Sequence, residues 1–215
     1  MKLLETREIT LQESDLRIQA RVAYEKGLPE PQKRSDGIHL SGVLKYIAIT
    51  TGMLKAGDED FEDEFPLRMA LGMAMECWFQ ALWPEMSWQP GEIAVDGVTG
   101  SMDGYSNIQH PNMPPPAEEI CVVEEFKLTY KSSRERHGAI TGEWLWMHQL
   151  MSYCYMLGTQ YGRLHVVWLN GAYEKVRLGE PRYCVYLVKF DERELVQNWK
   201  MIQASKGKAK GELHT

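Results

Sequence analysis

The sequence contains few cysteines, and none of them lies close to another. The four are Cys77, Cys121, Cys154 and Cys184. Because no C-x-x-C spacing occurs, the usual patterns of zinc and iron–sulfur sites are missing, and we expect neither zinc nor an iron–sulfur cluster. Reduced, buried thiols in a cytoplasmic protein are the simplest interpretation.

Long apolar runs and nucleotide-binding motifs are also missing. No run reaches transmembrane length, and the N-terminal segment MKLLETREITLQ lacks the apolar region of a signal peptide. No G-x-G-x-x-G motif or phosphate-binding P-loop occurs, which argues against a nucleotide-dependent function. We therefore expect a soluble, cytoplasmic protein without a membrane partner.

The charge and length of the chain limit the kind of protein further. The formal net charge of the 215 residues is −6, which argues against a protein that coats DNA non-specifically. It is compatible with an enzyme that has one local basic groove. The length suits one domain with a small appendage.

The predicted elements divide the chain into three parts. Residues 1–35 are predicted as a helical appendage and linker, because Thr10 and Glu13 form a capping box ahead of a helix. Residues 36–204 are predicted to alternate helices and strands, which indicates an α/β domain with a mixed central β-sheet flanked by helices. Asp191 is the expected N-cap of its last helix. Residues 205–215 have the composition of a flexible basic tail.

The segment 66–83 is predicted to be a helix that is apolar on nearly every side. Pro66 stands at its start and Pro84 just beyond its end, as helices prefer. Glu76 lies deep within it. A solvated glutamate is the simple interpretation, but a partly buried carboxylate needs a partner, and a metal ion is one.

Two β-prone pieces, EIAVDGV and SMDGYSNI, predict a hairpin around Thr99 and Gly100. Asp103 falls inside the second piece, where an aspartate disfavours a strand. Its simple interpretation is an Asp-Gly turn, and the alternative is a functional role.

The segment 120–132, ICVVEEFKLTYKS, is predicted to be a strand. Alternation of side chains places Glu125 and Lys127 on one face with Val123, and Glu124 and Phe126 on the other. Two charged groups on such a strand are not expected in the core. Alone, they are most simply a surface ion pair.

Polar residues after this strand complete the pattern. The basic loop that follows contains Lys131, Arg134 and Arg136, which are either a solvated run or contacts for phosphate groups. In the next predicted helix, Gln149 and Tyr153 are four residues apart and share a face.

Together these motifs resemble the PD-(D/E)xK nuclease superfamily, in its RecB-type and lambda-type exonuclease branch. The resemblance covers about residues 39–190 and is carried by RMALGMAMECW, SMDGY, VVEEFKL and QLMSYCYML. It implies a restriction-endonuclease-like core. A free-standing nuclease of this size would suit a phage or mobile element, and its place would then be the host cytoplasm.

The chain departs from the family pattern at two points. Met102, rather than the proline of the family name, precedes Asp103. The scattered cysteines do not match the four-cysteine iron–sulfur site of the CRISPR-associated relatives, so that cluster is expected to be absent.

The resemblance also implies roles for individual residues. Glu76, Asp103, Glu125 and the backbone carbonyl of Phe126 would bind Mg²⁺ or Mn²⁺, which suits these hard cations because all the ligands are oxygen atoms. Lys127 would orient the attacking water and stabilise developing negative charge. Gln149 and Tyr153 would contact DNA or support the metal site. The other candidates for contact with DNA are Lys131, Arg134 and Arg136.

The expected function is a metal-dependent deoxyribonuclease, an exonuclease that acts on DNA ends in recombination, repair or phage DNA processing. A recombination or replication protein would be a fitting partner. Two alternatives stay open: a catalytically silent nuclease fold that binds DNA or protein, and a site-specific endonuclease.

Overall fold

The computed structural model of the chain describes residues 1–9, 35–54, 72, 75–76, 78–80, 82–83, 85–88, 90–110, 118–129, 139–169 and 182–212. Within this part, a mixed sheet of six strands forms the centre of the fold, in the order β1-β8-β7-β6-β5-β2. The strands are β1 (Lys2–Ile9), β2 (Ser87–Trp88), β5 (Gly104–Gln109), β6 (Glu119–Thr129), β7 (Tyr161–Trp168) and β8 (Arg182–Lys189). The predicted fold class, a mixed sheet flanked by helices, is confirmed.

Strand β6 is the longest strand and has a neighbour on both sides. It pairs antiparallel with β5 and parallel with β7. Parallel neighbours need a crossover connection, and here it contains α4 (Ala139–Gly142) and α5 (Trp144–Leu157). Helix α5 ends at Gly158, whose φ of 74° is the left-handed conformation that favours glycine at a helix end.

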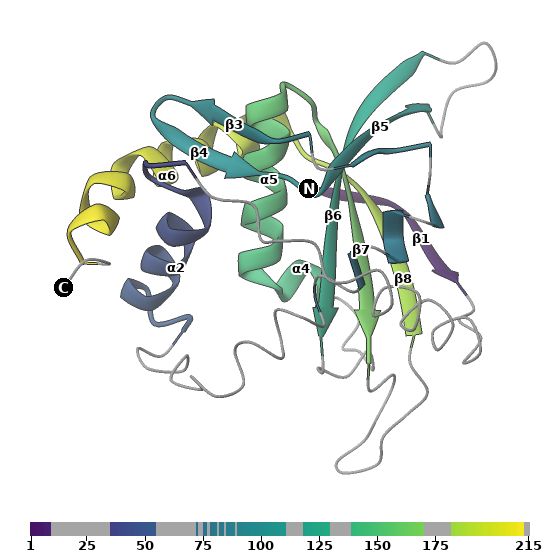
Figure 1. The fold of residues 1–215 in the computed structure, drawn as a ribbon, viewed down its shortest axis with the longest axis horizontal. Coiled ribbons are helices and arrows are strands. Elements are labelled where there is room, and N and C mark those ends of the chain that lie inside the picture. The colour runs from purple at the N-terminus through teal and green to yellow at the C-terminus, as the bar shows by residue number, and fades with distance from the viewer. Residues whose placement is uncertain are drawn as a thin grey trace.

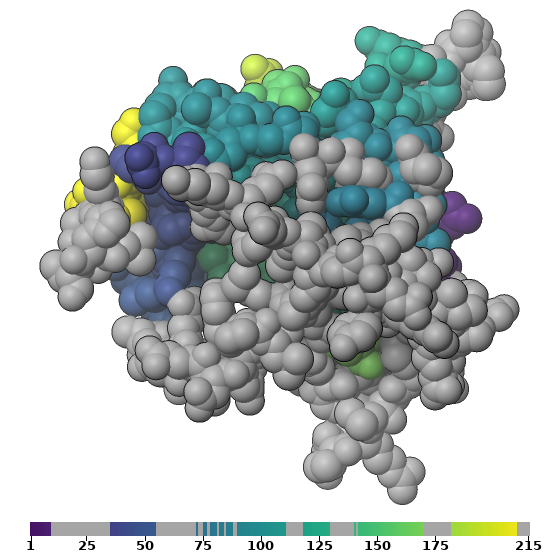
Figure 2. All heavy atoms as spheres, in the orientation of Figure 1, coloured from purple at the N-terminus to yellow at the C-terminus, as the bar shows by residue number. Residues whose placement is uncertain are grey.

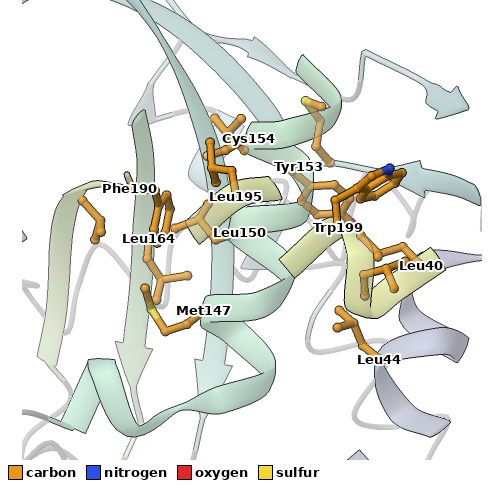
Figure 3. Packing of buried hydrophobic residues seen from close by; sticks show 14 of the residues in the cluster. Leu40, Leu44, Met147, Leu150, Tyr153, Cys154, Leu164, Phe190, Leu195 and Trp199 are labelled. Atoms are coloured by element: carbon orange, nitrogen blue, oxygen red, sulfur yellow. The ribbon is translucent and has the colours of Figure 1, made fainter. Parts of the chain in front are cut away.

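In the described part of the chain, three helices cover one face of the sheet. They are α2 (Leu40–Thr50), α5 and α6 (Glu192–Glu212), and all three contact one another. Figure 1 shows them together on one side, with a two-stranded hairpin across their upper ends. Their apolar side chains meet those of the sheet in the main core; examples in Figure 3 are Leu44, Leu150, Leu164 and Trp199.

Close packing between α5 and β7 depends on one glycine. A Cβ atom on Gly162 would lie 2.7 Å from the Cγ atom of Leu150, a residue with no exposed surface. Glycine at this position therefore lets the crossover helix lie directly on the strand that follows it.

The hairpin above these helices consists of β3 (Glu92–Val95) and β4 (Val98–Ser101). In Figure 2 its residues form the surface directly above α2. The turn lies at Asp96 and Gly97, whose φ angles are 48° and 75°, as an Asp-Gly hairpin turn requires. The prediction of a turn around Thr99 and Gly100 is wrong, because the second predicted piece divides between β4 and β5.

The two chain ends differ from the prediction. Residues 2–9 form β1, which pairs antiparallel with β8 at the edge of the sheet, so they are not part of a helical appendage. The helix predicted after Thr10 lies outside the described residues. At the other end, α6 continues to Glu212, so residues 205–212 are helical rather than a flexible tail.

The start of α6 agrees with the sequence. The Asp191 Oδ1 atom accepts a hydrogen bond from the N–H of Arg193 at 2.7 Å, and the Asp191 N–H donates to Glu194 Oε2 at 2.8 Å. This reciprocal arrangement is a capping box, and it confirms Asp191 as the N-cap. None of the helices in the described ranges is long and apolar enough to cross a membrane.

Candidate active site

Asp103 lies where the chain passes from one sheet to the other. Strand β4 ends at Ser101 and β5 begins at Gly104, so Asp103 occupies the link and not a strand interior. Its Oδ2 atom accepts a hydrogen bond from the N–H of Phe126 at 2.7 Å. Because Gly104 pairs with Glu124, the link places the Asp103 carboxylate beside the E-x-K segment of β6.

Glu125 is a buried residue, although charged side chains on this strand were not expected in the core. It is 1% exposed. Its Oε1 atom accepts a hydrogen bond from Lys127 Nζ at 2.5 Å, and the Lys127 side chain is 18% exposed. Its Oε2 atom is buried and has no hydrogen-bond partner among the described residues. A buried carboxylate oxygen without a partner is costly, and such an atom calls for a ligand.

The electrostatics of the three side chains are coupled. Burial, followed by the Glu125 carboxylate, raises the pKa of Asp103 well above its ordinary value. Burial also raises the pKa of Glu125, although the Lys127 ammonium opposes that shift. Burial alone would lower the pKa of Lys127, but Glu125 and Asp103 outweigh it and raise that pKa. The site therefore holds a protonated lysine between carboxyl groups that resist ionisation.

Glu76 belongs to the same acidic group. The described residues from 75 to 82 are helical, and Glu76 is partly exposed there. Its charge contributes to the raised pKa values of both Asp103 and Glu125. The four predicted catalytic residues come from three segments: Glu76 from the helical segment, Asp103 from the β4–β5 link, and Glu125 and Lys127 from β6.

A line of hydrogen bonds connects this group to α5 and β4. Lys127 Nζ donates to Gln149 Oε1 at 3.0 Å, and Gln149 Nε2 donates to the Tyr153 hydroxyl at 3.2 Å. The Tyr153 hydroxyl donates in turn to the Ser101 carbonyl at 2.7 Å. The line therefore ends two residues before Asp103, so Gln149 and Tyr153 tie the lysine to the chain segment that carries the aspartate.

This geometry bears on the predicted DNA contacts. Tyr153 is 3% exposed, so its side chain offers no surface to a phosphate group and supports the site instead. Gln149 is partly exposed, and its contact with DNA stays a prediction. Lys131, Arg134 and Arg136 lie outside the described residues.

Gly100, in β4, lies at a point of close contact with α5. A Cβ atom on Gly100 would lie 2.8 Å from the Cε1 atom of Tyr153 and 3.1 Å from the sulfur of Met156. Only glycine lets β4 approach α5 closely enough for the Tyr153 hydroxyl to reach Ser101.

The residues present fit a divalent metal ion of the magnesium type. Within the described ranges, no three His, Cys, Asp or Glu side chains are arranged as a ready set of ligands. Magnesium does not require such a set, because it binds through one or two carboxylates together with water and phosphate oxygens. The Oε2 atom of Glu125, which has no partner in the described part of the chain, and the adjoining Asp103 carboxylate meet this need. A cation there would offset the burial of both.

A second buried network, which the sequence did not predict, lies on the opposite face of β6. It contains Glu124, Ser106, Arg163, His165 and Tyr183. The available signal was the pair Glu124-Glu125 in an otherwise apolar strand, because alternation must send one carboxylate to each face.

No family model and no curated protein matches the chain. The chain is structurally similar to a phage-related exonuclease from Haemophilus somnus 129PT, at 12% identity and a TM-score of 0.47, over 97% of this chain and 96% of that one. It is also similar to an alkaline exonuclease from Laribacter hongkongensis, at 13% identity and a TM-score of 0.42, over 83% of this chain and 90% of that one. Because both TM-scores are below 0.5, the roles assigned to residues rest on the geometry of this chain.

Proposed function

We propose that the protein is a Mg²⁺- or Mn²⁺-dependent deoxyribonuclease that acts as an exonuclease on DNA ends. The observation that carries this proposal is the buried Glu125 carboxylate. Lys127 holds one of its oxygens, the other oxygen has no partner among the described residues, and Asp103 is its neighbour. An acidic group combined with a protonated lysine suits hydrolysis of a phosphodiester bond.

Residues of this chain would bind the cation, orient water and stabilise negative charge. Asp103, Glu125 and the Phe126 carbonyl would hold the cation, with Glu76 completing the set. When bound, the cation supplies charge neutralisation for the phosphate group and makes a water molecule more acidic. Lys127 keeps its proton at Nζ because the neighbouring carboxylates raise its pKa. It can therefore orient a water molecule and stabilise negative charge that develops on the phosphate oxygens.

The preference for DNA ends is the finer part of the proposal. It is supported by the Gln149–Tyr153 pair, which resembles the helix motif of the RecB-like branch. The alkaline exonuclease from Laribacter hongkongensis has been solved in complex with dAMP, a nucleotide of DNA. We propose DNA as the substrate here, and a recombination or replication protein as a further partner.

The test is a cleavage assay on end-labelled linear DNA and on covalently closed circular DNA, with Mg²⁺, Mn²⁺ or EDTA. We expect the wild type to degrade linear DNA only when metal is present and to leave circles intact. Asp103→Ala and Glu125→Ala should abolish cleavage, and Lys127→Ala should reduce it about 10²-fold or more. Glu119→Ala is the matched control, because Glu119 is an exposed glutamate at the start of the same strand.

Other results would support the alternatives. Cleavage of circles at defined positions would indicate a site-specific endonuclease. DNA binding without cleavage at any metal concentration would indicate a silent nuclease fold, and full activity in EDTA would exclude the metal-dependent mechanism.

A further inference from the structure

The face of β6 opposite the candidate site contains a second buried carboxylate. Glu124 has no exposed surface, and neither has His165 on β7 nor Tyr183 on β8. The proposed reaction uses none of these three residues. A buried, ionisable network of this kind carries a large desolvation cost, so its position in the fold needs an explanation.

The hydrogen bonds of this network fit one consistent assignment of protons. The Trp83 Nε1–H donates to the Tyr183 hydroxyl at 3.0 Å, and the Tyr183 O–H reaches His165 Nδ1 at 2.6 Å. His165 Nε2 lies 2.8 Å from Glu124 Oε2. A neutral His165 with its proton on Nε2 satisfies every member, since Nδ1 then accepts and Nε2 donates.

The other oxygen of Glu124 is held as firmly. Its Oε1 atom accepts hydrogen bonds from the Ser106 hydroxyl at 2.5 Å and from Arg163 Nη1 at 3.1 Å. The network thus spans β5, β6, β7 and β8 and reaches Trp83 at the end of the helical segment from residue 75. It joins that segment to the middle of the sheet.

The helical segment presents one stripe of residues to this face. Glu76, Phe79 and Trp83 are three and four residues apart and therefore lie on the same side of a helix. Phe79 stacks on Phe126 with ring centroids 3.9 Å apart, and Phe126 in turn lies 4.5 Å from the ring of His165. The residue between Glu125 and Lys127 is thus clamped between the helix and the network.

A separate reaction centre does not explain the network. The order carboxylate, imidazole and hydroxyl resembles that of a nucleophilic triad, but His165 and Tyr183 have no surface that a substrate could reach. Burial also raises the pKa of Tyr183, which keeps its oxygen protonated. The network is therefore a structural link and not a second reaction centre.

We infer that Glu124, His165 and Tyr183 are positioning residues, which fix the helical stripe on the sheet and thereby hold the Glu76 carboxylate against Asp103 and Glu125. Because Glu76 and Trp83 share one side of the helix, the helix cannot rotate without moving both. A rotation by one residue would turn both side chains away from the sheet. This inference rests on the proposed function, because it assigns the network a role in building the cation site.

The first test measures, without metal or DNA, how firmly the helical segment 75–83 is docked on the sheet. Tyr183→Phe keeps the ring but removes the hydroxyl, and with it the hydrogen bonds to the Trp83 N–H and to His165 Nδ1. We expect hydrogen exchange in the segment 75–83 to become faster by about 5- to 150-fold, the scale of one lost buried hydrogen bond. Tyr186→Phe is the matched control: it lies on the same strand, but packs against the main core on the other face.

The second test measures whether docking acts through Glu76. Binding of Mn²⁺ is measured by titration calorimetry in EDTA-free buffer, without DNA. We expect Tyr183→Phe to weaken binding about tenfold, the lower end for residues that support metal ligands. In a Glu76→Gln background the same substitution should have no further effect, because the carboxylate that the network positions is already gone. Trp83→Phe, which removes the donor from the helix side, should behave in the same way as Tyr183→Phe.

The outcomes test two roles separately: docking of the segment 75–83 on the sheet, and positioning of Glu76 for the cation. Unchanged exchange in the segment 75–83 would overturn the docking role. Faster exchange with unchanged Mn²⁺ affinity, or an equal loss of affinity in the Glu76→Gln background, would overturn the positioning role. If the wild type binds no Mn²⁺, the proposed function fails and the positioning role falls with it, while the exchange result still decides whether the network docks the helix.

Discussion

Glu124 and Glu125 are neighbours in sequence and both are buried, yet their carboxylates have different surroundings. Glu124 accepts hydrogen bonds at both oxygens from Ser106, Arg163 and His165. Among the described residues, Glu125 is held by Lys127 at one oxygen, and its other oxygen has no hydrogen-bond partner. A satisfied buried carboxylate stabilises a particular arrangement of its partners, whereas an incompletely satisfied one is prepared for a ligand.

The raised pKa of Asp103 predicts how stability depends on pH in the metal-free protein. A carboxyl group whose pKa rises on folding contributes stability that is complete below its unfolded pKa and is lost as the pH rises through the folded value. Stability should therefore fall as the pH rises above the ordinary value of 3.8.

Asp103→Asn removes this ionisation and keeps an oxygen that can accept from the Phe126 N–H. We expect a flatter pH profile and greater stability than the wild type at neutral pH, by about 1.4 kcal/mol for each unit by which folding raises the pKa. Urea unfolding in EDTA across the acidic-to-neutral range measures it. Asp36→Asn is the control, because Asp36 is an exposed carboxylate; equal slopes in the wild type and Asp103→Asn would contradict the prediction.

At the scale of elements, the contact between β4 and α5 is a second point where geometry is tight. Gly100→Ala would place a methyl group 2.8 Å from the ring of Tyr153. We expect a loss of about 1–3 kcal/mol in unfolding free energy from overpacking, together with lower nuclease activity because Tyr153 supports Gln149 and Lys127. Chemical unfolding and the cleavage assay measure the two effects.

Gly142→Ala provides the comparison for that experiment. Gly142 is exposed at the end of α4, and an added Cβ atom there meets nothing within 4 Å. It should leave both stability and activity near the wild-type values. A Gly100→Ala protein that behaves in the same way would show that α5 can move without cost.

The turn between β3 and β4 connects the hairpin to α6. Asp96 has a φ of 48°, and its Oδ2 atom accepts a hydrogen bond from Trp199 Nε1 at 2.9 Å. Asp96→Ala loses that acceptor beside a residue that is 3% exposed, and alanine disfavours this backbone conformation. We expect a loss of about 1–3 kcal/mol.

Asp96→Asn distinguishes the hydrogen bond and backbone conformation of Asp96 from its negative charge as causes of that loss. Asparagine keeps a side-chain oxygen and tolerates the left-handed conformation, so it should retain most of the stability of the wild type. Thermal and urea unfolding of the three proteins measure the difference. A similar loss in both variants would mean that the negative charge of Asp96, and not its hydrogen bond or conformation, stabilises the turn.

At the scale of the whole molecule, the proposed function requires the protein to bind a polyanion although its own net charge is −6. The acidic site adds to the repulsion, so local cations must offset it. Lys131, Arg134 and Arg136 follow the E-x-K strand in the sequence and are the proposed contacts for phosphate groups.

Replacing Arg134 and Arg136 by Ala should weaken DNA binding for all sequences alike. The slope of log affinity against log salt concentration should become shallower by about 0.9 for each duplex phosphate contact removed. The measurement is a salt titration in Ca²⁺, which can occupy the site while cleavage is slow. A variant with Arg193 and Lys200 changed to Ala controls for net charge, since both are exposed on α6; if both double variants keep the wild-type slope, the loop after β6 does not contact phosphate groups.

Much of the candidate site could be predicted from sequence because it depends on short-range spacing. Alternation along a strand separates Glu124 from Glu125, helical periodicity places Gln149 beside Tyr153, and the capping residue Asp191 marks a helix start. These features follow from the geometry of neighbouring residues, so the motif order and the fold class were accessible without coordinates.

Other features depended on residues that are distant in the chain. The pairing of Lys2 with Lys189 turned the N-terminal segment into an edge strand, and the approach of α5 to Gly100 joined Tyr153 to Ser101. Burial of Glu125, and the link from Trp83 through Tyr183 and His165 to Glu124, likewise required the assembled sheet. Spacing along the chain determines which residues share a face, but only the packing of both faces decides which of those residues lose contact with water and therefore need a partner.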